Sequence, residues 1–182
     1  AIKNVMPTRQ MLGVRTIFNI LGPLTNPAEV KYHLIGAYSK DLLKPMAQTL
    51  QQLGSKKAWL VHGKDGIDEI SISGPTKVTS LNDKKIESFE ISPSDAGLST
   101  HPLSEILGGS PAQNAVELRS LIEGKINPYR DAVLLNSSAA LLIAGKTKTL
   151  RQGVDIAAQA IESGATRNTL ELLSKLTNEN KQ

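Results

Sequence analysis

The sequence has no cysteine, few aromatic residues and no long hydrophobic run. The absence of cysteine from its 182 residues excludes disulfides, thiolate metal sites and cysteine nucleophiles. It also suits a reducing compartment, and we expect a cytoplasmic protein. One Trp, three Tyr and two Phe leave the hydrophobic core to aliphatic side chains. No stretch reaches the roughly 18 consecutive apolar residues that would indicate a membrane span.

Basic residues are dispersed along the chain. The net charge is +4, and lysines and arginines occur in small groups that are not interleaved with aromatic residues. A protein that binds nucleic acid typically gathers its basic residues on one face. The dispersed pattern therefore favours a solvated surface over a nucleic-acid interface.

Hydrophobic patterning predicts an α/β fold. Residues 32–38 and 57–61 are typical of buried strands, and residues 40–53 are typical of a helix capped by Ser39 and closed by Gly54. Strand, helix and strand at this spacing form a βαβ unit, in which the two strands are parallel. Three shorter alternating stretches predict a small antiparallel excursion: 69–73, 77–81 and 85–91.

The remaining segments are expected to be helical. A first helix over residues 5–20 is followed by a glycine and proline break at residues 21–27. Four more helices are expected at 111–124, 128–145, 148–163 and 166–177. Residues 132–143 are apolar nearly all round, which indicates a buried helix. Because the strands found here cover it poorly, we expect further strands from sequence that precedes residue 1.

An acidic pair, Asp68 and Glu69, follows the second strand within a loop that contains Gly63 and Gly66. Carboxylates are hard oxygen ligands, and Mg²⁺ typically takes one or two of them together with phosphates and water. The pair is therefore a candidate Mg²⁺ site. From the pattern alone, a solvated acidic turn explains it equally well.

A second candidate site combines Arg9 and Arg15 with the turn Gly22-Pro23. Arginine can hold a carboxylate or phosphate through two parallel hydrogen bonds. The pattern alone favours ion pairs on a helix surface.

Polar residues also interrupt the apolar helix, at Asn136, Ser137 and Ser138. Buried polar groups need partners, and small residues allow close helix packing. We therefore interpret these three residues as packing residues rather than catalytic ones.

Four segments resemble the anthranilate phosphoribosyltransferase family. The longest is residues 13–27, Gly-Val-Arg-Thr-Ile-Phe-Asn-Ile-Leu-Gly-Pro-Leu-Thr-Asn-Pro, and the others are residues 66–71, 127–136 and 144–153. The resemblance implies a large α/β domain of the nucleoside phosphorylase and phosphoribosyltransferase type, here residues 28–182. Residues 1–27 would then be a segment of the small helical domain through which members form homodimers.

The resemblance also implies an activity. Members transfer phosphoribose from phosphoribosyl pyrophosphate to anthranilate with Mg²⁺, giving phosphoribosylanthranilate and pyrophosphate in tryptophan biosynthesis. By position, Arg9 would hold anthranilate, Gly22 and Pro23 would line its channel, and Asp68 and Glu69 would bind Mg²⁺. No catalytic side chain is expected, because orienting a substrate that is already nucleophilic supplies most of the catalysis.

Two family motifs are missing from the chain, Gly-Thr-Gly-Gly-Asp and Lys-His-Gly-Asn, and both lie upstream of the matched region. We therefore expect a C-terminal part of such an enzyme that is inactive alone. Two other proteins on the same scaffold are alternatives. A pyrimidine-nucleoside phosphorylase should lack the acidic pair, and a non-enzymatic nucleic-acid-binding relative should show a concentrated basic groove.

Overall fold

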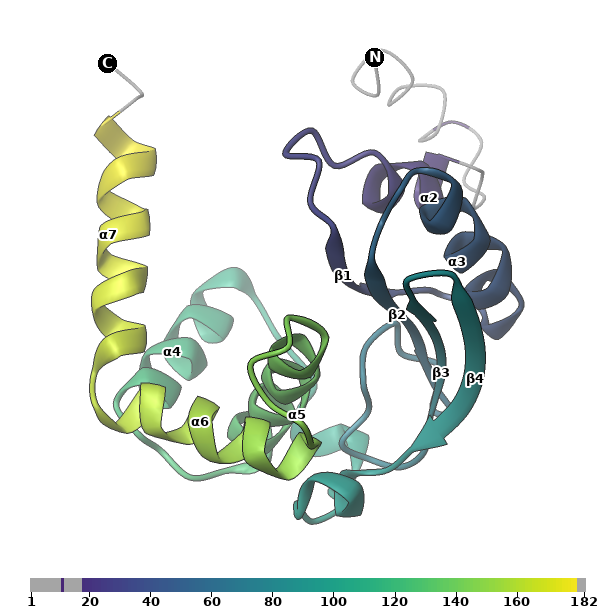
Figure 1. Ribbon diagram of the computed structural model, residues 1–182. Coiled ribbons are helices and arrows are strands. Elements are labelled where there is room, and N and C mark those ends of the chain that lie inside the picture. Colours follow the sequence, from purple (N-terminus) through teal and green to yellow (C-terminus); the bar gives the residue numbers. More distant parts are fainter. Residues whose placement is uncertain (1–10, 12–17, 180–182) are drawn as a thin grey trace.

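A four-stranded mixed sheet forms the centre of the fold, with helices on both faces (Figure 1). The computed structural model describes residue 11 and residues 18–179. The strands follow chain order across the sheet: β1 Tyr32–Gly36, β2 Lys57–Gly63, β3 Thr76–Asn82 and β4 Lys85–Ile91. β1 and β2 are parallel, whereas β3 and β4 are antiparallel to their neighbours. The expected α/β fold and parallel βαβ unit are confirmed.

The described residues contain six α-helices: α2 Phe18–Leu24, α3 Leu43–Gln52, α4 Pro111–Ile122, α5 Pro128–Ile143, α6 Leu150–Glu162 and α7 Ala165–Glu179. Short 3₁₀ turns lie at Lys40–Leu42, Pro93–Ala96 and Leu103–Glu105. Side chains of Ser110, Asn127 and Thr149 accept backbone N–H bonds at the starts of α4, α5 and α6. Across the described residues, every helix is too short or too polar to span a bilayer. The helix expected over residues 5–20 lies largely outside this part of the chain.

The two faces of β2 bury different layers. Trp59 and Val61 pack against α5 and α6, whereas Ala58 and Leu60 pack against α3. This division follows from the strand geometry, in which successive side chains point to opposite faces. Figure 1 shows α3 and α5 on opposite sides of the sheet. The core is largely aliphatic, as the composition predicts.

The first described helix, α2, extends further than the sequence predicts. We expected Gly22 and Pro23 to end it, but α2 contains both and ends at Leu24. Proline lacks the N–H that an interior helical residue donates, so a helix cannot continue far beyond it. The Thr25 N–H donates to the Gly22 carbonyl at 3.3 Å, and the Thr25 hydroxyl to the Leu21 carbonyl at 2.9 Å. The helix therefore ends one residue after the Gly-Pro pair, at Leu24.

Helices α5 and α6 cross closely at Gly153. A Cβ atom added there would lie 2.7 Å from Cα and Cβ of Ser138 and 2.9 Å from its carbonyl oxygen. Ser138 is fully buried, and its hydroxyl donates to the Leu135 carbonyl at 2.7 Å. The interpretation of Ser138 as a packing residue is confirmed.

We predict that Gly153→Ala destabilises the protein, because the new methyl group must push α6 away from the backbone of α5. Overpacking of this kind costs about 1–3 kcal/mol. Urea denaturation of the complete gene product measures the change. The control is Gly22→Ala, also in a helix, where an added Cβ meets no described atom within 4 Å. Equal destabilisation by the two substitutions would contradict the close crossing.

Candidate functional site

The acidic pair lies in the segment between β2 and β3, residues 64–75, which we call the acidic loop. Asp68 and Glu69 occupy bends of this loop, and both side chains are exposed. Within the described residues, neither carboxylate takes part in a hydrogen bond or ion pair. Their oxygen atoms are therefore available to a ligand.

Residues 69–73 do not form the strand that the sequence predicts. Several of their backbone groups pair with side chains rather than with a neighbouring strand. The Ile70 N–H and carbonyl both bond to the side chain of Asn136, and the Ser71 N–H donates to Thr76 Oγ1 at 2.9 Å. Because these partners come from separate elements, the segment is irregular although its residue pattern alternates.

The backbone of the acidic pair is held on both sides. On one side Gly36, at the end of β1, lies so close that an added Cβ would be 1.5 Å from the carbonyl oxygen of Asp68. On the other side Asn136 Oδ1 accepts from the Ile70 N–H at 3.1 Å, and its Nδ2 donates to the Ile70 carbonyl at 2.9 Å. The peptide unit after Glu69 is thus held by hydrogen bonds, and the Asp68 carbonyl before it is confined by close packing against Gly36.

Asp65 joins the first turn of the acidic loop to its later residues. Its Oδ2 accepts from the Ser71 hydroxyl at 2.5 Å and from the Ser73 hydroxyl, and its Oδ1 from the Ile67 N–H at 3.4 Å. Partial burial by itself would raise the pKa of the Asp65 carboxyl, but the hydrogen bonds from Ser71, Ser73 and Ile67 outweigh it and lower the pKa. The carboxylate form therefore stabilises the loop.

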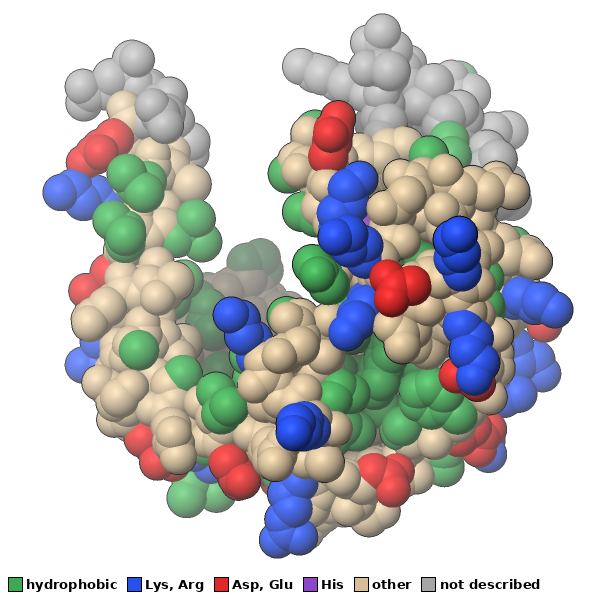
Figure 2. All heavy atoms as spheres, in the orientation of Figure 1, with side chains coloured by type: hydrophobic (Ala, Val, Ile, Leu, Met, Phe, Trp, Pro, Cys, Tyr) green, Lys and Arg blue, Asp and Glu red, His purple; other side chains and the backbone are tan. Residues whose placement is uncertain are grey.

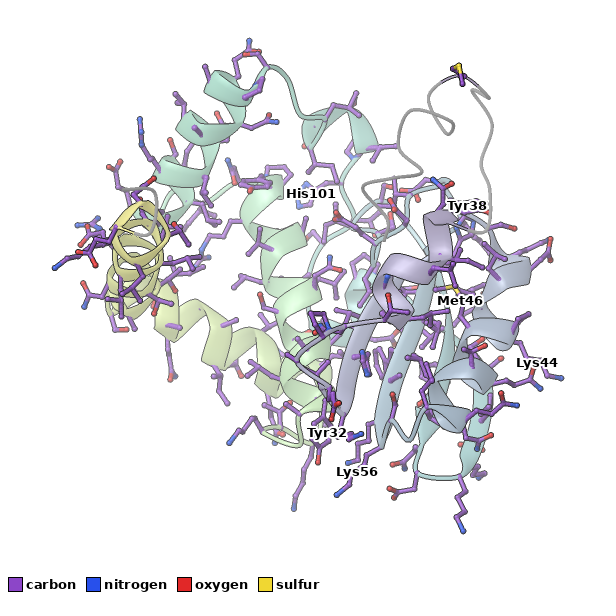
Figure 3. All side chains as sticks on the ribbon, turned by 90° about the horizontal axis from the view of Figure 1, so that it is seen from above. Tyr32, Tyr38, Lys44, Met46, Lys56 and His101 are labelled. Carbon is purple, nitrogen blue, oxygen red and sulfur yellow. The ribbon has the colours of Figure 1, made fainter. Side chains whose placement is uncertain are left out.

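Two histidines next to the acidic loop bond to groups other than the acidic pair. His62 Nδ1 bonds to the Ala37 carbonyl at 2.8 Å. The backbone N–H of His101 donates to the Ile72 carbonyl at 3.1 Å, and its ring Nε2 lies 3.2 Å from Asp131 Oδ2 on α5. Figure 3 shows His101 beside α5. Both histidines therefore fix neighbouring backbone or side chains.

The carboxylates of the acidic pair fit Mg²⁺ only if other ligands complete its coordination shell. Among the described residues, no three His, Cys, Asp or Glu side chains are grouped to hold an ion by themselves. Asp68 and Glu69 supply two unpaired carboxylates at an exposed position. Mg²⁺ commonly binds through one or two carboxylates and completes its shell with substrate phosphates and water. The pair suits an ion that arrives with a phosphorylated ligand.

The residues expected to contact the second substrate lie elsewhere. Arg9 is outside the described residues. Gly22 and Pro23 are in α2, and the following Leu24 lines a hollow with Leu50 of α3 near the start of β1.

The acidic loop contacts the opposite end of β1, at Gly36. Figure 3 shows these two ends through Tyr32, the first residue of β1, and Tyr38 beyond its end. At about 3.3 Å per residue, β1 separates them by about 13 Å. A Cβ added at Gly22 would meet no described atom within 4 Å, so Gly22 makes no close contact with the acidic pair in this part of the chain.

Three residues that shape the site, Gly36, Asp65 and Asn136, were not predicted as site residues. In the sequence Asn136 is only a polar interruption of an apolar helix, and its partner Ile70 is 66 residues away. Gly36 ends a strand, and a glycine at a strand end is common enough that it does not indicate a site. The only local signal was the position of Asp65 within the same glycine loop as the pair.

Comparison with known proteins confirms the resemblance found in the sequence. Residues 1–167 match the family model described as "Glycosyl transferase family, a/b domain". An anthranilate phosphoribosyltransferase of Rhodopseudomonas palustris (strain HaA2) is 53% identical over 173 residues, which are 95% of this chain and 51% of that protein. Its counterpart in Hyphomonas neptunium is 50% identical over 98% of this chain and 52% of that protein. The chain thus spans about half the length of these curated relatives.

Solved structures give the same result for the fold. Anthranilate phosphoribosyltransferase from Saccharomyces cerevisiae in complex with PRPP and Mg has a TM-score of 0.85 at 30% identity, over 93% of this chain and 49% of that one. Its complex with 4-fluoroanthranilate has a TM-score of 0.84 at 30% identity, over 93% of this chain and 50% of that one.

We predict that acid removes a stabilising contribution of Asp65. The folded pKa lies below the ordinary value of 3.8. The contribution is therefore complete above the unfolded pKa and is lost as the pH falls through the lower folded pKa. The unfolding midpoint temperatures of the protein and of Asp65→Asn are compared between neutral pH and pH about 3. The gap between the two midpoints should narrow as the pH falls. The control Asp83→Asn makes the same charge change at an exposed turn, and an identical pH profile in both variants would contradict the prediction.

Proposed function

The chain belongs to the glycosyl transferase family whose a/b domain matches residues 1–167, and we propose that it supplies part of an enzyme that transfers phosphoribose from phosphoribosyl pyrophosphate to anthranilate. The products are phosphoribosylanthranilate and pyrophosphate, an exchange that serves tryptophan biosynthesis. The observation that carries the proposal is the acidic pair, two carboxylates with no partner among the described residues, on a backbone bonded to Asn136 and packed against Gly36. Relatives with this activity are about 50% identical to nearly the whole chain.

Asp68 and Glu69 would hold Mg²⁺ beside the pyrophosphate of the donor substrate. When bound, the ion neutralises pyrophosphate and so makes it a better leaving group. The carboxylates contribute position, because the backbone that carries them is already held by Gly36 and Asn136. Ligands fixed before the substrate arrives do not have to reorganise during the reaction.

The transfer itself exchanges one bond at the ribose for another. The bond from ribose C1 to pyrophosphate breaks, the anthranilate amine nitrogen bonds to C1, and the amine loses a proton. An aromatic amine is already a nucleophile, so the protein has chiefly to orient it. We propose that Arg9 holds the anthranilate carboxylate and that Gly22 and Pro23 line its channel, as the resemblance implies. The complex of the Saccharomyces cerevisiae relative with 4-fluoroanthranilate supports the substrate class.

The resemblance also leads us to propose a homodimer and a cytoplasmic location. The 182 residues contain no Gly-Thr-Gly-Gly-Asp sequence, which the family uses for pyrophosphate, and we propose that by themselves they do not turn over substrate. The two alternative functions gain no support. The acidic loop is intact, and Figure 2 shows Lys and Arg side chains spread over the visible face among acidic ones rather than gathered in a groove.

We predict that the complete gene product consumes anthranilate, followed by its fluorescence, when phosphoribosyl pyrophosphate and Mg²⁺ are added. Asp68→Ala and Glu69→Ala should each raise the Mg²⁺ concentration needed for half-maximal rate by at least about 10-fold, because even residues that only support metal ligands cost that much. The control is Asp155→Ala, an exposed carboxylate on α6. An unchanged Mg²⁺ requirement in both acidic variants would rule out their metal role.

We predict a separate defect for Arg9→Ala. Loss of a charge-assisted hydrogen bond to a carboxylate costs about 1.5–3 kcal/mol, equivalent to roughly a 10- to 100-fold rise in KM for anthranilate. The KM for phosphoribosyl pyrophosphate should stay near its original value. Steady-state kinetics with each substrate varied in turn measures both constants, with Arg167→Ala on exposed α7 as the control. A defect confined to phosphoribosyl pyrophosphate would show that Arg9 binds the other substrate.

A further inference from the structure

Asn136 occupies the middle of α5, yet all its side-chain hydrogen bonds go to backbone groups. Its Oδ1 accepts from the Ile70 N–H at 3.1 Å, and its Nδ2 donates to the Ile70 carbonyl at 2.9 Å and to the Ala132 carbonyl at 3.0 Å. Ile70 is only 2% exposed, so water cannot readily replace these bonds. One side chain thus satisfies both backbone polar groups of the residue that follows the acidic pair.

This arrangement acts on Glu69 through the shared peptide unit. The Ile70 N–H belongs to the same plane as the Glu69 carbonyl, because the peptide bond is rigid. The Asp68 carbonyl of the preceding peptide unit packs closely against Gly36, which leaves it little room to rotate. Two neighbouring carboxylates repel each other, and a free loop could separate them by rotating either peptide unit. One unit is hydrogen-bonded and the other is confined by packing, so both rotations are restricted.

We propose that Asn136 is a positioning residue, which holds the acidic pair in the geometry that binds a divalent cation. The proposal rests on the proposed role of Asp68 and Glu69 in Mg²⁺ binding. The side-chain bonds of Asn136 in the described part of the chain go to the backbone of Ile70 and Ala132. It acts through the backbone of Ile70.

The packing of α5 does not by itself require this asparagine. Leu135, Ala139 and Ile143 of α5 are buried against Trp59, Val61 and Ile72 in one hydrophobic cluster. That contact docks the helix on the sheet. An apolar side chain at position 136 would suit the apolar helix, but it would leave both backbone groups of Ile70 without partners.

The test uses Asn136→Ala in the complete gene product, with Mn²⁺ as the probe ion. Loss of the two bonds should raise the Mn²⁺ dissociation constant, measured by electron paramagnetic resonance, by about 10-fold or more, as for other residues that orient metal ligands. Hydrogen exchange at the Ile70 amide should accelerate without any metal present. The Mg²⁺ concentration for half-maximal rate should rise by the same factor as the dissociation constant, while the KM for anthranilate stays unchanged.

Asn114 on α4 provides a matched control. Its Oδ1 accepts from the Gly109 N–H at 2.8 Å, and its Nδ2 donates to the Gly109 carbonyl at 3.4 Å. Asn114→Ala therefore removes the same two kinds of bond from another loop and should leave Mn²⁺ binding unchanged. Asn136→Gln keeps both the amide acceptor and the amide donor, one methylene further from the helix, and adds no charge beside the acidic pair. It should show exchange at Ile70 between that of the original protein and that of Asn136→Ala, and it serves if the alanine variant unfolds.

Two results would overturn the proposal. One is unchanged Mn²⁺ affinity in both position-136 variants while hydrogen exchange at Ile70 accelerates. The bonds between Asn136 and Ile70 would then have only a structural role. The other is an undiminished effect of Asn136→Ala on Mn²⁺ affinity in an Asp68→Ala, Glu69→Ala background. A residue that acts on the cation through the pair must lose that effect when the pair is removed. Failure of the proposed function looks different: the original protein would bind Mn²⁺ in an Asn136-dependent manner but would not consume anthranilate.

Discussion

The two hydrogen bonds between Asn136 and Ile70 connect the helical layer to the loop that follows the central strand. Their geometry depends on how α5 sits on the sheet. Leu135 is fully buried against the sheet, and the next residue is rotated by about 100° around the helix. The apolar contact therefore sets the rotation of α5, and that rotation directs the amide at the loop. Hydrophobic packing fixes the orientation of the helix, and the Asn136 amide on that helix restrains the backbone next to the acidic pair.

The fold was largely predictable because its signals are local. Ser110, Asn127 and Thr149 cap the helices that they precede, and the turn at residues 83–84 joins β3 to β4. The strand predicted at residues 69–73 was wrong because alternation describes side chains and not where backbone groups find partners. Those partners, Asn136 and Thr76, become known only when the helices and strands are placed. Local pattern thus predicts elements, and tertiary contacts decide the irregular segment between them.

The charged residues of the candidate site were predictable from the sequence, but the residues that hold them in place were not. Asp68 and Glu69 stand out as acidic residues on a glycine loop, and the structure places both on the surface without partners among the described residues. Gly36 lies 32 residues before Asp68, and nothing around it indicates that a carbonyl oxygen will take the space of its missing side chain. Residue type therefore indicates which groups bind a ligand, whereas the fold decides which groups hold them.

The contrast between a fixed backbone and unpaired side chains is itself informative. A loop selected only for stability would be expected to pair its carboxylates or separate them, because adjacent like charges repel. Here Asp65 receives three hydrogen bonds while Asp68 and Glu69, on the same loop, have no partner within the described residues. Natural proteins depart from locally favourable choices mainly where function requires it. A cation bound by the pair would offset their repulsion, and because it binds only the folded loop it would also stabilise that loop.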